Sequence, residues 1–243
     1  MKTNQEFKNQ ALAALKGNWG RALLATLVYA IILTIATAPN IWGTLEMQAY
    51  LTEKGGMTLS TAASIIQDPA YQLLQQKANG TSALLFVLEV FLILPLSVGF
   101  ANALRRLLVS ADNDVLGNTF QLSFSNYWHK VLGMLLMVIL TALWSLLLVI
   151  PGIIKSFSYA MTRYILEENP ELSAREAIHR SRMMMRGHKF DLFWLYLSFI
   201  GWLILSFFTF GIGLLWLVPY METAQAAFYE EVKADYAVNG GLD

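Results

Sequence analysis

Long stretches without a charged side chain constrain this chain more than any other feature of its sequence. Residues 22–45, 131–154 and 192–221 contain no Asp, Glu, Lys or Arg, and residues 78–104 are interrupted only by Glu89. A helix rises ~1.5 Å per residue and the hydrocarbon layer of a bilayer is ~30 Å thick, so about 20 apolar residues span it. The sequence therefore predicts an all-α, polytopic helical membrane protein.

The overall composition supports this class and argues against several functions. Hydrophobic residues make up 56% of the chain and charged residues 14%, whereas soluble domains contain about 25% charged residues. The formal net charge is zero, so no bulk attraction to nucleic acid is expected. Cysteine is absent, the histidines lie far apart, and the serines lack a nucleophile elbow. We therefore expect no enzymatic activity, no metal, no cofactor and no nucleic-acid partner.

Breaks within the apolar runs predict about six transmembrane helices arranged as three hairpins, in a single membrane domain over residues 1–243. Pro151-Gly152 favours a tight turn, because proline removes a backbone donor and glycine permits positive φ; Gly211-Ile212-Gly213 divides the longest run. The predicted membrane helices are residues 20–39, 82–108, 128–150, 153–167, 189–208 and 212–232. Between the first two we expect an extracytoplasmic loop over residues 40–80, with turns around one or two short helices.

The distribution of Lys and Arg predicts the orientation. With the N-terminus in the cytoplasm, all basic residues lie inside except Lys54, Lys77 and Lys155. An excess of basic residues in cytoplasmic segments is the usual pattern for membrane proteins. Both termini are therefore expected in the cytoplasm.

An amphipathic helix is predicted before the first membrane helix, over residues 3–17. Thr3 and Glu6 have the spacing of a capping box, and Gly17 is a suitable stop. Apolar residues recur at helical spacing from Phe7 to Leu15. We expect this helix to lie on the membrane surface.

A second amphipathic helix, over residues 173–187, is expected on the cytoplasmic side. Ser173 and Glu176 form another capping box, and Gly187 supplies the stop. Its basic side chains share one stripe, which Lys189 follows: Arg175, His179, Arg182 and Arg186. A basic helix at the inner leaflet attracts anionic lipid headgroups, so we expect these residues to bind such lipids. The alternative is that the arginines only fix the topology.

Four charged residues fall inside predicted membrane helices. Glu89 and Lys155 lie towards the same outer edge, and Arg163 and Glu222 share a depth beyond the two glycine turns. A charge at the bilayer centre costs ~2.5–3.5 kcal/mol on insertion scales, so such residues usually face a partner or water. They are interpreted either as ion pairs that lock helices together or as part of an ion or proton path.

Single glycines inside the predicted helices are interpreted as points of close helix contact. They are Gly99, Gly133, Gly201 and Gly211. Small residues let neighbouring helix backbones approach closely in membrane proteins. This interpretation is structural rather than catalytic.

Several clusters together resemble one family. They include Leu15-Lys16-Gly17-Asn18-Trp19, Pro95-Leu96-Ser97-Val98-Gly99-Phe100, Ile150-Pro151-Gly152-Ile153-Ile154-Lys155, Gly187-His188-Lys189 and Gly211-Ile212-Gly213-Leu214-Leu215-Trp216 with Pro219-Tyr220. The chain is similar to the bacterial integral membrane proteins of domain of unknown function 975 over residues 4–231. The resemblance implies a polytopic protein of the bacterial plasma membrane, and it brings no catalytic residue. Residues 40–80 are the part least similar to the family.

These observations favour a non-enzymatic membrane scaffold that binds lipid or a partner protein through its cytoplasmic basic helix. The alternative is a transporter or exporter subunit, because of the charged residues within the membrane helices.

Overall fold

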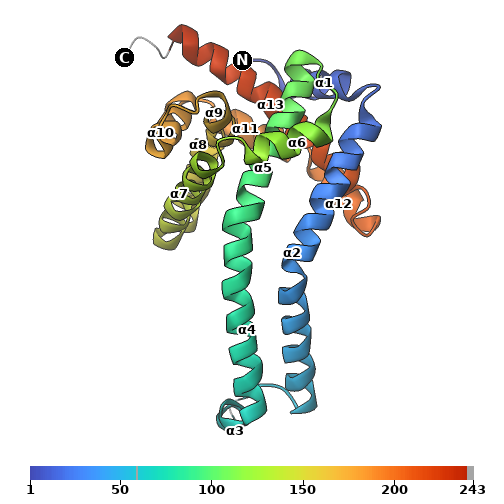
Figure 1. Cartoon of the computed structure of the whole chain (residues 1–243), viewed down its shortest axis with the longest axis vertical. Helices are drawn as coiled ribbons and strands as arrows, with labels where there is room; N and C mark the ends of the chain where they lie inside the picture. Colours follow the sequence, from blue (N-terminus) through green and yellow to red (C-terminus); the bar gives the residue numbers. More distant parts are fainter. Residues whose placement is uncertain (59, 240–243) are drawn as a thin grey trace. The chain divides into compact units, whose positions relative to one another are not determined.

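The computed structural model describes residues 1–58 and 60–239, and all regular elements in that part of the chain are helices (Figure 1). The prediction of an all-α protein is therefore confirmed. The chain divides into two compact units, one formed by Met1–Tyr29 with Leu94–Asp243 and the other by Ala30–Ile93.

Among the described residues, four helical segments are long and apolar enough to cross a membrane. They are Trp19–Ala36, Val90–Ser110, Tyr127–Leu147 and Lys189–Phe208. The other two predicted membrane helices fall in α8 (Val149–Tyr159) with α9 (Thr162–Glu168), and in α13 (Leu214–Asn239). α8 and α9 are each short, and α13 contains charged residues, so the count of six membrane helices stays a prediction.

The smaller unit is more helical than the sequence suggested. α2 (Trp19–Glu53) continues well past residue 39, α3 (Ala62–Gln67) is short, and α4 (Pro69–Leu88) leads into a π-helix, η1 (Glu89–Ile93). Residues 40–53, 62–67 and 69–80 are helical, so this segment is more helical than the expected loop with one or two short helices. Its extracytoplasmic location stays a prediction. α2 ends before Gly55 and Gly56, which both have positive φ, at +80° and +83°.

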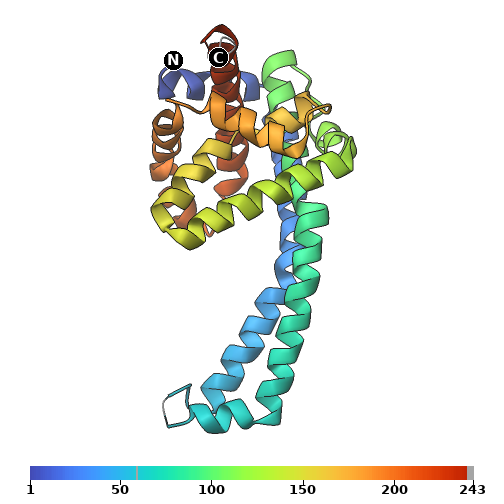
Figure 2. The same cartoon turned by 90° about the vertical axis from the view of Figure 1, so that its left-hand side faces the viewer.

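The larger unit contains the remaining helices. Besides α8, α9 and α13, they are α1 (Asn4–Leu15), α5 (Leu94–Ser110), α6 (Val115–Phe124), α7 (Tyr127–Leu147), α10 (Ala174–Met184), α11 (Lys189–Leu197) and α12 (Ile200–Phe208). Figure 2 shows α7 and α8 as the two arms of one hairpin, and α12 and α13 form the arms of another. The sequence analysis did not predict α6.

The N-terminal helix is capped as predicted but faces protein. The Thr3 and Glu6 side chains form the reciprocal capping box, and Gly17 has φ +79°. The apolar face of α1 is buried against α5 and α13, and the rings of Phe7 and Phe228 lie 5.4 Å apart. The sequence analysis placed this face against lipid, since amphipathic spacing alone does not distinguish a lipid surface from a protein one.

Candidate functional site

The basic helix α10 is fastened to a break in the preceding helical hairpin. α8 ends at Tyr159 and α9 begins at Thr162, and some backbone groups at such a break lose their helical partners. The Ser181 hydroxyl satisfies two of them, because it donates to the Ser158 carbonyl at 3.0 Å and accepts from the Met161 amide at 3.2 Å. Ser181 is fully buried. This contact fixes which face of α10 points away from the protein.

The predicted basic stripe is exposed. Arg175, His179, Arg182 and Arg186 are all exposed, and Lys189, the first residue of α11, is half-buried. The capping box of Ser173 and Glu176 is present, and Arg186 lies just beyond the end of α10. The opposite face of α10 is buried against protein through Ala177, Ile178, Ser181 and Met184. It is therefore not available to insert into lipid, and α10 presents charge alone to its surroundings.

A cavity of about 540 Å³ lies in the larger unit, and we call it the Arg163 cavity. Helices α5, α7, α8, α9, α11 and α13 contribute to its wall. The lining residues are Ser97, Met134, Met137, Val138, Thr141, Ala142, Ser145, Ser156, Tyr159, Ala160, Arg163, Tyr196, Glu222 and Gln225. Its volume is within the range of ordinary small-molecule sites.

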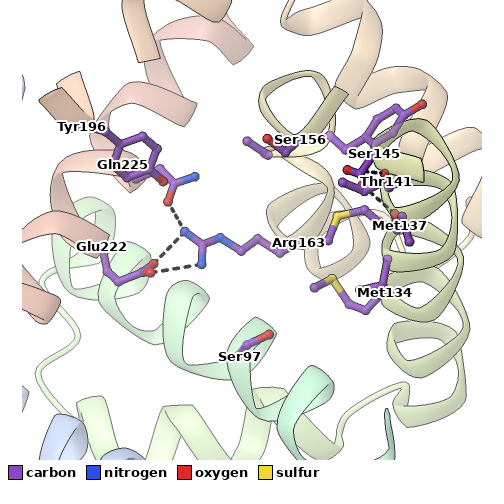
Figure 3. A pocket seen from close by; sticks show the side chains of 14 residues that line it. Ser97, Met134, Met137, Thr141, Ser145, Ser156, Arg163, Tyr196, Glu222 and Gln225 are labelled. Atoms are coloured by element: carbon purple, nitrogen blue, oxygen red, sulfur yellow. Dashed lines mark hydrogen bonds and ion pairs between the residues drawn. The ribbon is translucent and has the colours of Figure 1, made fainter. Parts of the chain in front are cut away.

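Arg163 and Glu222 are brought together at one end of this cavity. Arg163 Nη1 donates to Glu222 Oε1 at 3.2 Å, and Nη2 lies 2.7 Å from Oε2. Arg163 also donates to the Gln225 side chain. Figure 3 shows the guanidinium pointing towards Glu222 and Gln225, with Met134 and Met137 on the α7 side. The two charges that the sequence placed at one depth thus form an ion pair on the cavity wall.

The polar wall of the cavity offers mainly acceptors. The hydroxyl protons of Ser97, Thr141 and Ser145 are donated to carbonyls of their own helices, at 2.6, 2.8 and 3.0 Å. Within the described part of the chain, Arg163 Nε has no hydrogen-bond partner although it is buried. The cavity therefore combines an ion pair with lone pairs and shows no arrangement of nucleophile and base.

The second predicted intramembrane pair, Glu89 with Lys155, is not observed in the described part of the chain. The Glu89 side chain lies outside the described residues, although its backbone belongs to η1. Lys155 places its ammonium 4.4 Å from the ring centroid of Trp144. The proposed pairing of Glu89 with Lys155 therefore stays a prediction.

A charge network that the sequence analysis missed is centred on Glu168, at the end of α9. Glu168 accepts hydrogen bonds from Tyr229 Oη and Lys233 Nζ, each at 2.5 Å, and it also binds Arg105. Burial raises the pKa of the Glu168 carboxyl, but the hydrogen bonds from Lys233 and Tyr229, together with the Arg105 charge, outweigh burial and leave the pKa below its usual value. Arg105 also binds Glu230, so the network joins α5, α9 and α13.

The adjacent Glu167 takes part in a second ion pair. Lys130 is 0% exposed, and its ammonium lies 2.5 Å from Glu167 Oε2. It also donates to the Ser125 hydroxyl at 2.7 Å and to the Leu122 carbonyl. The sequence did contain a signal for these ion pairs. Glu167 and Glu168 lie at the end of a predicted membrane helix, on the same predicted side of the membrane as Arg105 and several other basic residues.

Comparison with known proteins identifies the family. A family model described as protein of unknown function (DUF975) matches residues 1–236. The chain belongs to this family. No curated protein and no solved structure matches it. Within the described residues, no group of three or more His, Asp or Glu side chains is placed to hold a metal ion.

Proposed function

We propose that this DUF975 protein is a multi-pass protein of the bacterial plasma membrane, with six membrane helices in three hairpins and both termini in the cytoplasm. Four apolar helical segments of sufficient length support the membrane location. The arms α8–α9 and α13 supply the other two membrane helices of the proposal. The excess of basic residues at the proposed cytoplasmic ends supports the orientation.

Its proposed role is that of a non-enzymatic scaffold that binds anionic lipid headgroups, or an acidic partner protein, through the exposed face of α10. The observation that carries this proposal is that the arginines of this face are exposed and lack partners within the described part of the chain. The side chains of Arg175, Arg182 and Arg186 are exposed and make no hydrogen bond or ion pair with the described part of the chain. The buried bases Arg163 and Lys130 each have a carboxylate. The protein thus neutralises its interior charges and leaves this face free.

Lipid binding by the full chain in detergent tests this proposal. Each basic residue near an anionic surface contributes about 1 kcal/mol, so Arg175→Gln/Arg182→Gln should weaken phosphatidylglycerol binding by about 2 kcal/mol, or roughly 30-fold. Native mass spectrometry with phosphatidylglycerol and phosphatidylcholine measures the change. The matched control is Lys16→Gln/Arg21→Gln, which removes two exposed charges elsewhere in the larger unit.

The two double variants separate a specific face from bulk charge. A loss confined to the α10 variant supports the scaffold. Equal losses in both variants, or equal binding of the two lipids by the unaltered protein, would contradict it. Loss of an acidic protein partner, with lipid binding unchanged, would assign the same face to a partner protein.

The second candidate function is a transporter or exporter subunit. The observation that favours it is that the Arg163–Glu222 pair lines a cavity of about 540 Å³ and is partly accessible within it. An ion pair on a cavity wall is typical of an ion or proton path. Proton flux into proteoliposomes, followed with a trapped pH-sensitive dye, tests this role. Flux that Glu222→Gln abolishes would support transport, and the absence of flux above protein-free vesicles would count against it.

A further inference from the structure

The two hairpins of the larger unit end in turns made of exposed apolar side chains. We call residues 146–150, between α7 and α8, the first tip, and residues 207–212, between α12 and α13, the second tip. Leu146 is 84% exposed and Ile150 71%, while Phe207 is 81% and Phe210 100% exposed. Neither tip contains a charged residue. Turns in water are normally rich in polar residues, so the composition of both tips is that of a buried turn.

Both hairpins use the same small-residue contact behind the tip. A Cβ built on Gly152 would lie 2.7 Å from Ser145 Cα, and one built on Gly213 would lie 3.0 Å from Ser206 Cα. The spacing from serine to glycine is the same in the two hairpins. The arms of each hairpin therefore approach closely through the same type of contact, and the two tips are equivalent in construction.

The backbone amides of the second tip find their hydrogen-bond partners within the turn. The amides of residues 209–212 donate to carbonyls of residues 206, 207 and 209 at 3.0–3.2 Å. The Gly213 amide donates to Thr209 Oγ1 at 2.9 Å, and the Thr209 hydroxyl donates to the Ser206 carbonyl at 2.8 Å. The amides of residues 214–217 donate to carbonyls of residues 211–213. A turn exposed to lipid must satisfy its polar groups internally, because hydrocarbon offers no partner.

The residue at the apex of the second tip is unusual for a water-exposed turn. Phe210 has φ +50°, a left-handed conformation that glycine and asparagine adopt far more readily than an aromatic residue. Its ring is fully exposed. A bulky apolar side chain in this strained position is expected where the ring enters an apolar surrounding.

The charge-free part of the first arm of each hairpin is shorter than the hydrocarbon layer, although the whole segments Tyr127–Leu147 and Lys189–Phe208 are long enough to cross a membrane. The first tip begins 16 residues after Lys130, and the second begins 16 residues after Asp191, which is ~24 Å at ~1.5 Å per residue before any tilt or break. The hydrocarbon layer is ~30 Å thick. α11 and α12 are separated by a break at Ser198 and Phe199, which shortens that arm further.

We infer that both tips end within the hydrocarbon of the bilayer and that their partner is lipid acyl chains, not water beyond the membrane. The membrane helices of these two hairpins would then enter the bilayer and return to the same side without crossing it. The inference uses the orientation given under Proposed function only to say which side the arms enter from. The first tip lies closer along the chain to a charged residue than the second tip does. Its nearest charge, Lys155, lies against the Trp144 ring a short distance behind the turn.

Cysteine labelling tests this directly, because the natural chain contains no cysteine. Phe208→Cys places a thiol at the second tip, Leu147→Cys places one at the first, and both positions are highly exposed. Ser60→Cys and Glu171→Cys report on the two proposed aqueous sides. A membrane-impermeant maleimide is applied to intact cells and to opened cells. In both, it is expected to label the tip cysteines at least roughly tenfold more slowly than the aqueous control, Ser60→Cys or Glu171→Cys, that the reagent can reach. The reason is that the reagent attacks a thiolate, which apolar surroundings disfavour. Detergent should remove the difference.

The outcomes distinguish this inference from the proposed topology. Labelling of Phe208→Cys in intact cells at the rate of Ser60→Cys would overturn it, and so would rapid labelling from inside in opened cells. If Ser60→Cys reacts only in opened cells and Glu171→Cys reacts in intact cells, the orientation is wrong while protected tips still support the inference. Should one tip variant fail to fold, judged by gel filtration in detergent, the other tip decides.

Discussion

The close contact between α5 and α6 gives the sharpest quantitative expectation. Gly99 lies on α5, and a Cβ built there would be 2.0 Å from Ser123 Oγ, 2.2 Å from the Thr119 carbonyl oxygen and 2.7 Å from the Ser123 amide nitrogen. The last two are backbone atoms of α6, so no side-chain rotation relieves them. For Gly99→Ala, α6 must move away by about 1 Å or more before ordinary contact distances return.

Such a movement removes the partners of a buried charge. The ammonium of Lys130 donates to the Leu122 carbonyl and the Ser125 hydroxyl at the C-terminal end of α6. Overpacking alone costs about 1–3 kcal/mol, and a hydrogen bond to a charged group contributes about 1.5–3 kcal/mol. Losing one such bond together with the overpacking strain gives an expected loss of about 2.5–6 kcal/mol of unfolding free energy for Gly99→Ala.

Unfolding by SDS in mixed micelles, followed by tryptophan fluorescence, measures this loss. Gly201→Ala is the matched control, because nothing lies within 4 Å of a Cβ at Gly201. Gly201 is the second residue of α12, so alanine there should leave the unfolding free energy unchanged or raise it by less than the ~0.5–1 kcal/mol of a mid-helix site. Adding Ser123→Gly to Gly99→Ala removes the hydroxyl clash and leaves the clash with the Thr119 carbonyl, so it should restore only part of the loss. Equal stability of Gly99→Ala and Gly201→Ala would refute the reasoning.

Substitutions also test three other contacts of the larger unit. The folded-state pKa of Glu168 lies below its ordinary 4.5, so its contribution to stability is complete above that pH and is lost as the pH falls through the lower folded value; Glu168→Gln should flatten the fall of Tm below pH 4.5, and an unchanged profile would contradict the network. Arg163→Gln and Glu222→Gln should each lower the unfolding free energy by about 2–3 kcal/mol, less than for a fully buried pair because both groups are partly exposed. The swap Arg163→Glu/Glu222→Arg should recover part of that loss. Additive losses in the swap would argue against a structural pair. Ser173→Ala should cost about 1 kcal/mol through the lost cap of α10, measured by the same unfolding assay, with no change as the contrary result.

Local signals in the sequence predicted the ends of helices well. The two capping boxes depend on residues three positions apart, so the pairs Thr3 with Glu6 and Ser173 with Glu176 are visible without tertiary information. Gly17 and Gly187 both have positive φ, +79° and +85°, as a helix stop requires.

Tertiary contacts decide the features that were missed. α6 is held by its contact with Gly99 and by the Asp114 cap on the Gly117 amide, and nothing in its short sequence separates it from a loop. Close helix contact is confirmed for Gly99 and Gly133 but is wrong for Gly201, which has open space, and Gly211 has positive φ. Spacing in one chain does not show which glycine faces a neighbour.

In the candidate site, too, features that depend on position along one helix were predictable, and features that depend on tertiary packing were not. Depth from a turn can be counted along a helix, and that count brought Arg163 and Glu222 to one level. The cavity beside them depends on how α7, α8 and α13 pack, which periodicity does not determine. Glu168 was missed because its partners lie far away in the sequence, on α5 and α13.

Ser181 connects the two surfaces for which functions are proposed. Its hydroxyl holds the Met161 amide, and Arg163 follows two residues later on α9. Asn102 holds the same segment from α5, because its amide donates to the Arg163 carbonyl at 3.0 Å. Any displacement of α10 must either break the Ser181 hydrogen bonds or move the start of α9, and the bond from Asn102 resists the second. The basic face of α10 and the ion-paired wall of the Arg163 cavity are therefore connected through Ser181 and the start of α9.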